Sequence, residues 1–261
     1  MPDDPHHDEP PRVPPPHSRA VPGSRYVPDP DVEEEWLAIP GPGSARVRVR
    51  IFRPAGSDGP LPVILYLHGP AAPPAGTDAH RGLVDDMVLG ADAAVVVPEP
   101  DGPDDARHPA AVDRARTVLR WVADEGVEES LDGGRIAVVG TGSGAHHAAL
   151  ALLARERGEP RPVQQVLVCP VADAAGDTPP HRLRDMPPAL VVTAGADVHR
   201  DAGEAYATRL KEAGVPVVSV RYNGTLHGFV PLPALRSTAA ARAATLQITD
   251  TLHIALRRPV R

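Results

Sequence analysis

The chain has 261 residues, 42% of them hydrophobic, and a formal net charge of −7 at pH 7. This length favours one large α/β domain over two small ones. The mild acidity and the lack of a basic stripe argue against a nucleic-acid partner. No apolar run approaches the roughly 20 residues that cross a bilayer, and the acidic, proline-rich start lacks the features of a secretory signal. The single cysteine, Cys169, fits a reducing compartment, so we expect a cytoplasmic protein without membrane association.

The first 30 residues are rich in proline and acidic side chains and contain almost no apolar clusters. Such a segment buries too little surface to offset the entropy that is lost on ordering. We therefore expect a disordered arm over residues 1–30 and a folded domain over residues 31–261.

Apolar runs separated by turn residues predict the strands. The first two runs are joined by Pro40-Gly41-Pro42-Gly43 and predict an antiparallel edge of a mixed sheet. The continuous apolar runs that follow are typical of strands buried on both faces. The predicted strands are Trp36–Ile39, Val47–Ile51, Val63–Leu67, Ala94–Val97, Ile136–Val139, Val166–Cys169, Leu190–Val192 and Val217–Val220.

Apolar residues at helical spacing between these runs predict helices. The clearest helix covers Ala110–Glu125, with Ala115, Leu119 and Val122 on its apolar face. Strands that alternate with helices imply an α/β fold with a doubly wound, mainly parallel sheet, in which ligands bind beyond the carboxyl ends of the strands. The other predicted helices are Arg81–Leu89, His146–Glu156, Ala202–Ala213 and Ala234–Leu256.

A glycine cluster after the strand at Ile136–Val139 predicts a tight turn that brings a helix N-terminus to the sheet edge. Two interpretations compete. The spacing fits a nucleophile elbow, G-x-S-x-G, with Gly142 at the position of the exposed serine. Gly140, Gly142 and Ala145 also fit the G-x-G-x-x-G/A pattern of a dinucleotide-binding loop. That second pattern needs an acidic residue at the end of the next strand, which instead ends Val168-Cys169-Pro170.

Over roughly residues 33–257, the chain resembles the hormone-sensitive-lipase-like carboxylesterases of the α/β-hydrolase superfamily. PVILYLHG at 62–69 is similar to that family's strand into its His-Gly-Gly-Gly oxyanion motif, and DGGRIAVVG at 132–140 to its strand into the elbow. The long block at 186–230 resembles the two strands that carry the family's catalytic acid and histidine. The resemblance implies an α/β-hydrolase fold.

The resemblance also implies functional residues. Asp197 in GADVHRD matches the family's triad acid, and His227 in GTLHGF matches its triad base. A carboxylate bonded to the far imidazole nitrogen fixes the tautomer and raises the basicity of the ring. The implied oxyanion and substrate-binding residues are His68, Gly69, Ala71, Gly142, Ser143 and Gly144.

The sequence departs from the family's pattern at three places. Gly142 stands where the family has its nucleophilic serine, and Ser143 falls one residue later, at the helix start. The oxyanion motif reads His68-Gly69-Pro70-Ala71, and Pro70 has no N–H to donate. Only residues 170–185 separate the strand ending at Cys169 from the next one, so we expect a reduced cap over the site.

These features predict chemistry without a serine nucleophile on a small organic molecule. His227, oriented by Asp197, would take a proton from water or from the substrate, giving hydrolysis, elimination or cyclisation. The alternatives are a non-catalytic binding scaffold, a conventional esterase that uses Ser143, and a dinucleotide-binding protein. We expect no cofactor.

A metal site is not expected either, because helix-start histidines such as His146 and His147 are more often surface or packing residues. The expected partner is therefore a small-molecule substrate or ligand. The edge strand at 216–222 and the last helix are the surfaces that we expect to pair if the chain forms a homodimer.

Overall fold

The computed structural model describes residues 26–69, 76–100, 109–155, 158–171, 176 and 178–257. The arm predicted at 1–30 lies outside the described residues up to position 25, and so do Pro70 and Ala71. In the described ranges, no helix combines the length and apolar character that crossing a membrane requires.

Within these ranges a single sheet of eight strands has the order β1-β2-β4-β3-β5-β6-β7-β8. β2 pairs antiparallel with both β1 and β4, and all the other pairs are parallel. The predicted α/β fold, with a mainly parallel sheet and an antiparallel N-terminal edge, is confirmed. The strands are β1 (Val32–Pro40), β2 (Arg46–Pro54), β3 (Leu61–His68), β4 (Ala94–Glu99), β5 (Leu131–Thr141), β6 (Gln164–Val168), β7 (Ala189–Ala194) and β8 (Val217–Tyr222).

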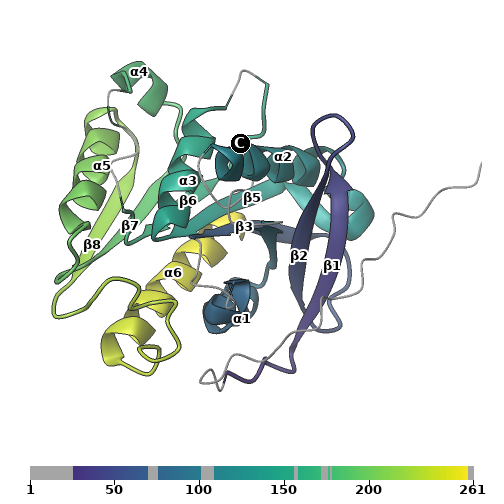
Figure 1. Cartoon of the computed structure of the whole chain (residues 1–261), viewed down its shortest axis with the longest axis horizontal. Helices are drawn as coiled ribbons and strands as arrows, with labels where there is room; N and C mark the ends of the chain where they lie inside the picture. Colours follow the sequence, from purple (N-terminus) through teal and green to yellow (C-terminus); the bar gives the residue numbers. More distant parts are fainter. Residues whose placement is uncertain are drawn as a thin grey trace, which may run out of the picture.

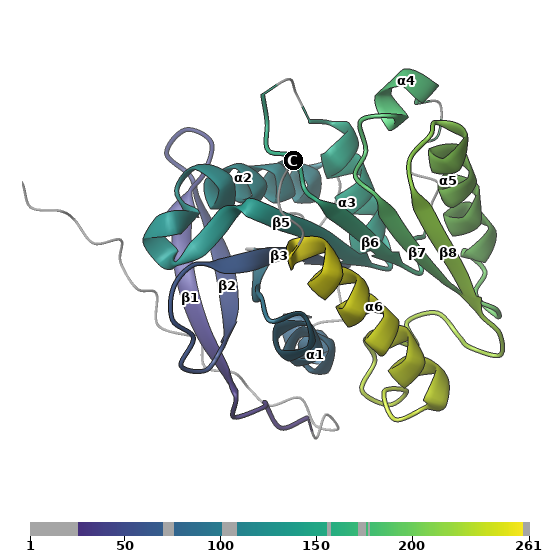
Figure 2. The same ribbon diagram turned by 180° about the vertical axis from the view of Figure 1, so that it is seen from behind.

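Helices cover both faces of the sheet (Figures 1 and 2). On one face, α1 (Arg81–Ala91) and α6 (Ala239–Arg257) lie side by side over a core that includes Met87 and Ile248. On the other face, α2 (Ala110–Asp124), α3 (Ser143–Leu153) and α5 (Arg200–Glu212) pack over a second core. The short helices are η1 (Gly76–His80), η2 (Gly126–Glu129) and α4 (Pro180–Leu183).

The last helix begins at Ala239 and not at Ala234, where apolar spacing placed its start. The hydroxyl of Thr238 accepts the N–H of Ala241 at 3.2 Å, which is the bond of an N-terminal cap. Before this cap, the N–H of Thr238 bonds to the carbonyl of Leu235 at 3.0 Å, so the chain turns instead of continuing as an α-helix. The helix start is therefore set by a hydroxyl that the apolar pattern does not include.

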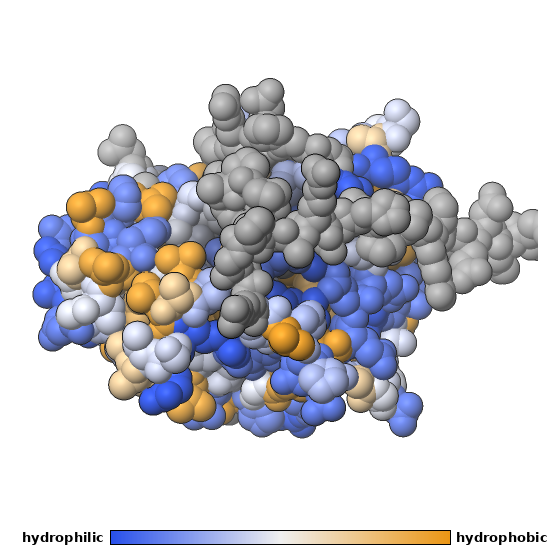
Figure 3. All heavy atoms as spheres, turned by 60° about the horizontal axis from the view of Figure 1, so that its bottom comes forward, coloured by the Kyte–Doolittle hydropathy of each residue, from blue (hydrophilic) through white to orange (hydrophobic). Residues whose placement is uncertain are grey.

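β8 is the exposed edge of the sheet and not a strand buried on both faces. Val218 on β8 is 56% exposed, and Leu246 and Ile254 on α6 are also exposed. On the face in Figure 3, hydrophobic residues form small groups among hydrophilic ones. Pairing of two copies through β8 or α6 stays a prediction. The reduced cap also stays a prediction, because part of the segment at 170–185 lies outside the described residues.

Buried ion pairs fasten η1 and the start of α1 to the antiparallel edge. Arg50 on β2 is 6% exposed and pairs with Glu34 at 2.8 Å, Asp78 at 2.9 Å and Glu99 at 3.5 Å. Its guanidinium carbon also lies 4.9 Å from the ring centroid of Trp36. Because Asp78 belongs to η1, Arg50 ties this short helix to the sheet.

We expect Arg50→Leu to lower the free energy of unfolding by about 3–5 kcal/mol, because it removes a buried guanidinium that pairs with three carboxylates. Urea unfolding followed by circular dichroism measures this change. As a control, Arg135→Leu removes a partly exposed pair with Asp132 and should cost about 0–1 kcal/mol. Equal losses in the two variants would contradict the structural role of Arg50.

Candidate functional site

The turn between β5 and α3 forms the centre of the site. Gly142 has φ 58° and ψ −125°, a left-handed backbone conformation that glycine adopts without strain. The N–H of Gly142 donates to the carbonyl of Val168 at 2.9 Å, and α3 begins at the next residue. The predicted strand, tight turn and helix are therefore present, with Gly142 at the sharpest point of the turn.

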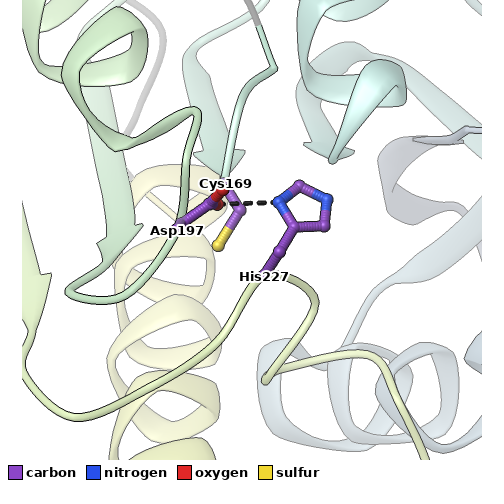
Figure 4. A group of neighbouring side chains, drawn as sticks. All are labelled: Cys169, Asp197 and His227. Carbon is purple, nitrogen blue, oxygen red and sulfur yellow. Dashed lines mark hydrogen bonds and ion pairs between the residues drawn. The ribbon is translucent and has the colours of Figure 1, made fainter.

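Asp197 and His227 come from the loops after β7 and β8. These loops are joined by a hydrogen bond from the N–H of Ala196 to the carbonyl of Thr225 at 2.9 Å. Nδ1 of His227 lies 2.7 Å from Oδ2 of Asp197 (Figure 4), and Oδ1 accepts the N–H of His199 at 2.9 Å. The Asp197 side chain is 1% exposed and that of His227 is 44% exposed. The carboxylate thus holds a proton on Nδ1 and leaves Nε2 as a base that solvent and ligands can reach.

His227 faces the backbone of Gly142. A Cβ built on Gly142 would lie 3.4 Å from Nε2 of His227 and 3.9 Å from Cε1, which is ordinary van der Waals contact. Because Gly142 has no side chain, Nε2 is left open to the cavity that both residues line, where a water molecule could give it a proton.

A cavity of about 190 Å³ opens in front of this pair. It brings together Gly69, Gly142, Ser143 and His227 among the residues that the sequence predicted. Asp197 lies behind His227. The N–H groups of Ser143 and Gly144 begin α3, where they have no intrahelical acceptor and the helix dipole is positive.

Besides Asp197, two described residues that the sequence predicted, Gly144 and His68, are not part of this cavity wall. Gly144 packs against β3, since a Cβ there would lie 2.2 Å from the carbonyl oxygen of Leu67. His68 donates from Nδ1 to the carbonyl of Gly69 at 2.8 Å and lines a smaller neighbouring cavity together with His147. Ala71 lies outside the described residues.

Ser143 points toward Gly69 rather than toward His227. A Cβ built on Gly69 would lie only 2.0 Å from Oγ of Ser143, so the hydroxyl occupies the space beside that glycine. Ser143 and His227 are both described, and no hydrogen bond joins them. This direction follows from the position of Ser143, one residue after the turn, because each helical residue rotates the side chain by about 100°.

Cys169 completes a group that the sequence did not predict. Its sulfur and the ligand atoms of Asp197 and His227 all lie within 4.8 Å of one another, as a metal site would require. Burial raises the pKa of the Cys169 thiol to about 12, so the sulfur is protonated at neutral pH. The carboxylate of Asp197 already accepts two hydrogen bonds, one of them from the imidazole of His227. The arrangement therefore favours a histidine base over a metal centre.

His80 is a second imidazole on the cavity wall, and sequence analysis missed it. It ends η1 and is 9% exposed, with Nδ1 at 2.6 Å from the hydroxyl oxygen of Tyr66. Burial lowers the pKa of His80 to about 3, and the nearby His68 adds to this effect. The imidazole of His80 is therefore neutral under physiological conditions.

Comparison with known proteins gives consistent matches. The model of a family described as alpha/beta hydrolase fold matches residues 64–183 and 176–231. The chain is 32% identical to esterase LipI of Mycobacterium tuberculosis over 269 residues, covering 86% of this chain and 84% of LipI. It is 30% identical to carboxylesterase NlhH of the same organism, covering 82% and 80% of the two chains. The crystal structure of a thermostable esterase from Pseudomonas putida has a TM-score of 0.79 and 31% identity, covering 88% and 85%.

His80 makes the stability of the protein depend on pH. Its pKa is about 3 in the folded chain and about 6.5 in an unfolded one, so the unfolded state binds an additional proton between these values. The protein therefore has its full stability above about pH 6.5, and its free energy of unfolding decreases as the pH falls below this value. When the pH falls from about 7 to about 5, His80 should lower the free energy of unfolding by about 2 kcal/mol.

Urea unfolding of the wild type and of His80→Gln at both pH values measures this contribution. The variant should lose about 2 kcal/mol less than the wild type over the same interval. If both proteins lose the same amount, His80 is not a buried neutral imidazole.

Proposed function

Because this chain belongs to the alpha/beta hydrolase fold family and is a carboxylesterase-like hydrolase, we propose that it cleaves a small carboxylic ester with His227 as general base. The observation that carries the proposal is the 2.7 Å bond between His227 and the buried Asp197, at a cavity that His227 and Gly142 both line. In this proposal Gly142 takes the place of a serine nucleophile, and water attacks the ester directly.

The proposed reaction has two steps. Nε2 of His227 removes a proton from a water molecule beside Gly142 while the water oxygen attacks the ester carbonyl carbon. Asp197 stabilises the imidazolium that forms. The imidazolium then gives its proton to the departing alkoxide oxygen, and the tetrahedral intermediate collapses to a carboxylic acid and an alcohol. Such proton transfer contributes about 10²–10⁴-fold to a rate.

The negative charge that develops on the carbonyl oxygen needs hydrogen-bond donors. The N–H of Ser143 at the start of α3 is one donor, and the positive end of the helix dipole adds to it. Pro70 offers no N–H in the segment that follows Gly69. The oxyanion site proposed here is therefore weaker than one with three consecutive glycines.

Ester hydrolysis is the reaction we favour over elimination, cyclisation or binding without catalysis. The relatives are named as esterases, and they align with most of this chain. A carboxylate as buried as Asp197 is costly unless it is paired, and its partner here is an imidazole that opens to a cavity. The opening of the imidazole to a cavity gives Nε2 access to a ligand, which a general base requires.

A conventional esterase with Ser143 as nucleophile is the second candidate. Ser143 lines the same cavity as His227, and the named relatives support an ordinary esterase mechanism. In this mechanism, the Ser143 side chain must turn from Gly69 toward Nε2 before it can give up its proton.

We expect slow hydrolysis of p-nitrophenyl acetate by the wild type, and a loss of about 10²-fold or more in His227→Ala. The His253→Ala variant is a control, because His253 on α6 bonds to the carbonyl of Ala91, away from the cavity. Gly142→Ser should raise kcat about 10²-fold or more, since a hydroxyl there can reach Nε2. Unchanged activity in His227→Ala would exclude the general-base proposal.

Covalent labelling separates the two candidates. A fluorophosphonate reacts with activated serines, so it should label Gly142→Ser but not the wild type. Ser143→Ala should keep the wild-type rate of ester hydrolysis. Labelling of the wild type at Ser143, together with loss of activity in Ser143→Ala, would establish the conventional mechanism instead.

A further inference from the structure

Two imidazoles face the same cavity from opposite parts of the chain. His227 follows β8, whereas His80 ends η1, and both line the space in front of Gly142. His227 is held by a carboxylate, so it suits a base. The imidazole of His80 is bonded instead to an uncharged group, the phenol hydroxyl of Tyr66.

His80 is the end of a buried chain of hydrogen bonds. The hydroxyl oxygen of Tyr66 lies 3.0 Å from Oγ1 of Thr141 and 2.6 Å from Nδ1 of His80. A phenol is a better donor than acceptor, and an imidazole nitrogen is a strong acceptor. The Tyr66 hydroxyl therefore donates to Nδ1, and the Thr141 hydroxyl donates to Tyr66. This order places the single proton of a neutral His80 on Nε2.

The second nitrogen of His80 has no protein partner in the described part of the chain. The hydrogen bond that holds the ring goes through Nδ1, and no bond joins Nε2 to another described residue. An N–H group on a cavity wall donates its hydrogen bond to water or to a ligand that enters the cavity. The cavity that His80 shares with His227 supplies the space for such an acceptor.

We propose that His80 is a catalytic residue that donates a hydrogen bond from Nε2–H to the carbonyl oxygen of the substrate as that oxygen becomes negative. This inference rests on the proposed ester hydrolysis and adds a side-chain donor to it. Pro70 cannot donate from the backbone in the segment after Gly69, so a donor from another element would offset that loss.

Ion pairs on both sides of His80 hold the imidazole in place. Asp78, two residues before it, bonds to Arg50 of β2 at 2.9 Å. Arg81, directly after it, bonds to Asp85 at 2.7 Å and also pairs with Glu34. A donor that is fixed before the reaction stabilises a transition state without having to reorient. These contacts give His80 the rigidity that such a donor needs.

Kinetics with p-nitrophenyl acetate provide the first test. His80→Ala should lower kcat by about 10²–10³-fold with little change in KM, because the donor acts on the charged transition state. His80→Gln should recover part of the rate through its amide N–H. Tyr66→Phe should also lower kcat, because it removes the bond that keeps the proton on Nε2. His253→Gln is the matched control and should behave as the wild type.

A second measurement does not depend on turnover. Nitrogen-15 NMR of the histidine rings reports which nitrogen of His80 carries the proton, and we expect the Nε2–H form in the wild type. Trifluoroacetone hydrate resembles the tetrahedral intermediate. The wild type and His80→Gln should bind it more tightly than His80→Ala does. Calorimetry measures these affinities.

The two measurements distinguish failure of the inference from failure of the proposed function. If the wild type hydrolyses no ester, the proposed function is wrong, and the NMR and calorimetric results still decide the role of His80. A proton on Nδ1, or equal binding of trifluoroacetone hydrate to the wild type and His80→Ala, would overturn the inference. Full activity in His80→Ala alongside a strong defect in His227→Ala would overturn it and leave the proposed function intact.

Discussion

The close approach of backbones at the β5–α3 turn is the constraint on which the site depends. A Cβ on Gly144 would lie 2.2 Å from the carbonyl oxygen of Leu67, and one on Gly140 would lie 2.4 Å from the Cα of Ala145. Gly144 therefore lets α3 begin directly beside β3, and Gly140 lets the first turn of α3 pack closely on β5, at the carboxyl edge of the sheet. The result is a set of helix N–H groups in front of His227, with Gly142 between them and the imidazole. Larger residues at 140 and 144 would move the helix and separate the parts of the site.

Electrostatic anchoring extends from the edge of the sheet to the cavity. Arg50 of β2 pairs with Asp78 of η1, and Arg81 of α1 pairs with Glu34 of β1. His80 lies between Asp78 and Arg81 in the sequence. At the same cavity, Asp197 holds His227 by a hydrogen bond of 2.7 Å. The two imidazoles thus have different surroundings: His227 is bonded to a carboxylate, whereas burial, with His68 nearby, lowers the pKa of His80 and keeps it neutral. This division is typical of sites in which one group accepts a proton while another stabilises charge.

Much of this arrangement could be predicted from the sequence, because the apolar runs and the glycine cluster depend on local patterns. Local patterns predicted the strands and the order of the helices. The pairing of Asp197 with His227 was predicted from the resemblance to a family. The burial of Arg50 could not be predicted, because its three carboxylate partners come from β1, η1 and β4. His80 was missed because it follows a short polar segment without periodicity. Tyr66 was the available signal, since a hydroxyl inside a continuous apolar strand needs a buried partner.

The proposed direct attack by water differs from the ordinary esterase mechanism because it leaves no covalent intermediate. Intact-protein mass spectrometry on samples quenched during turnover of p-nitrophenyl acetate tests this difference most directly. If water attacks directly, the wild type keeps its unmodified mass throughout turnover, whereas Gly142→Ser accumulates an acetyl group. An acetyl group on Ser143 of the wild type that forms and decays at the rate of turnover would contradict direct attack by water.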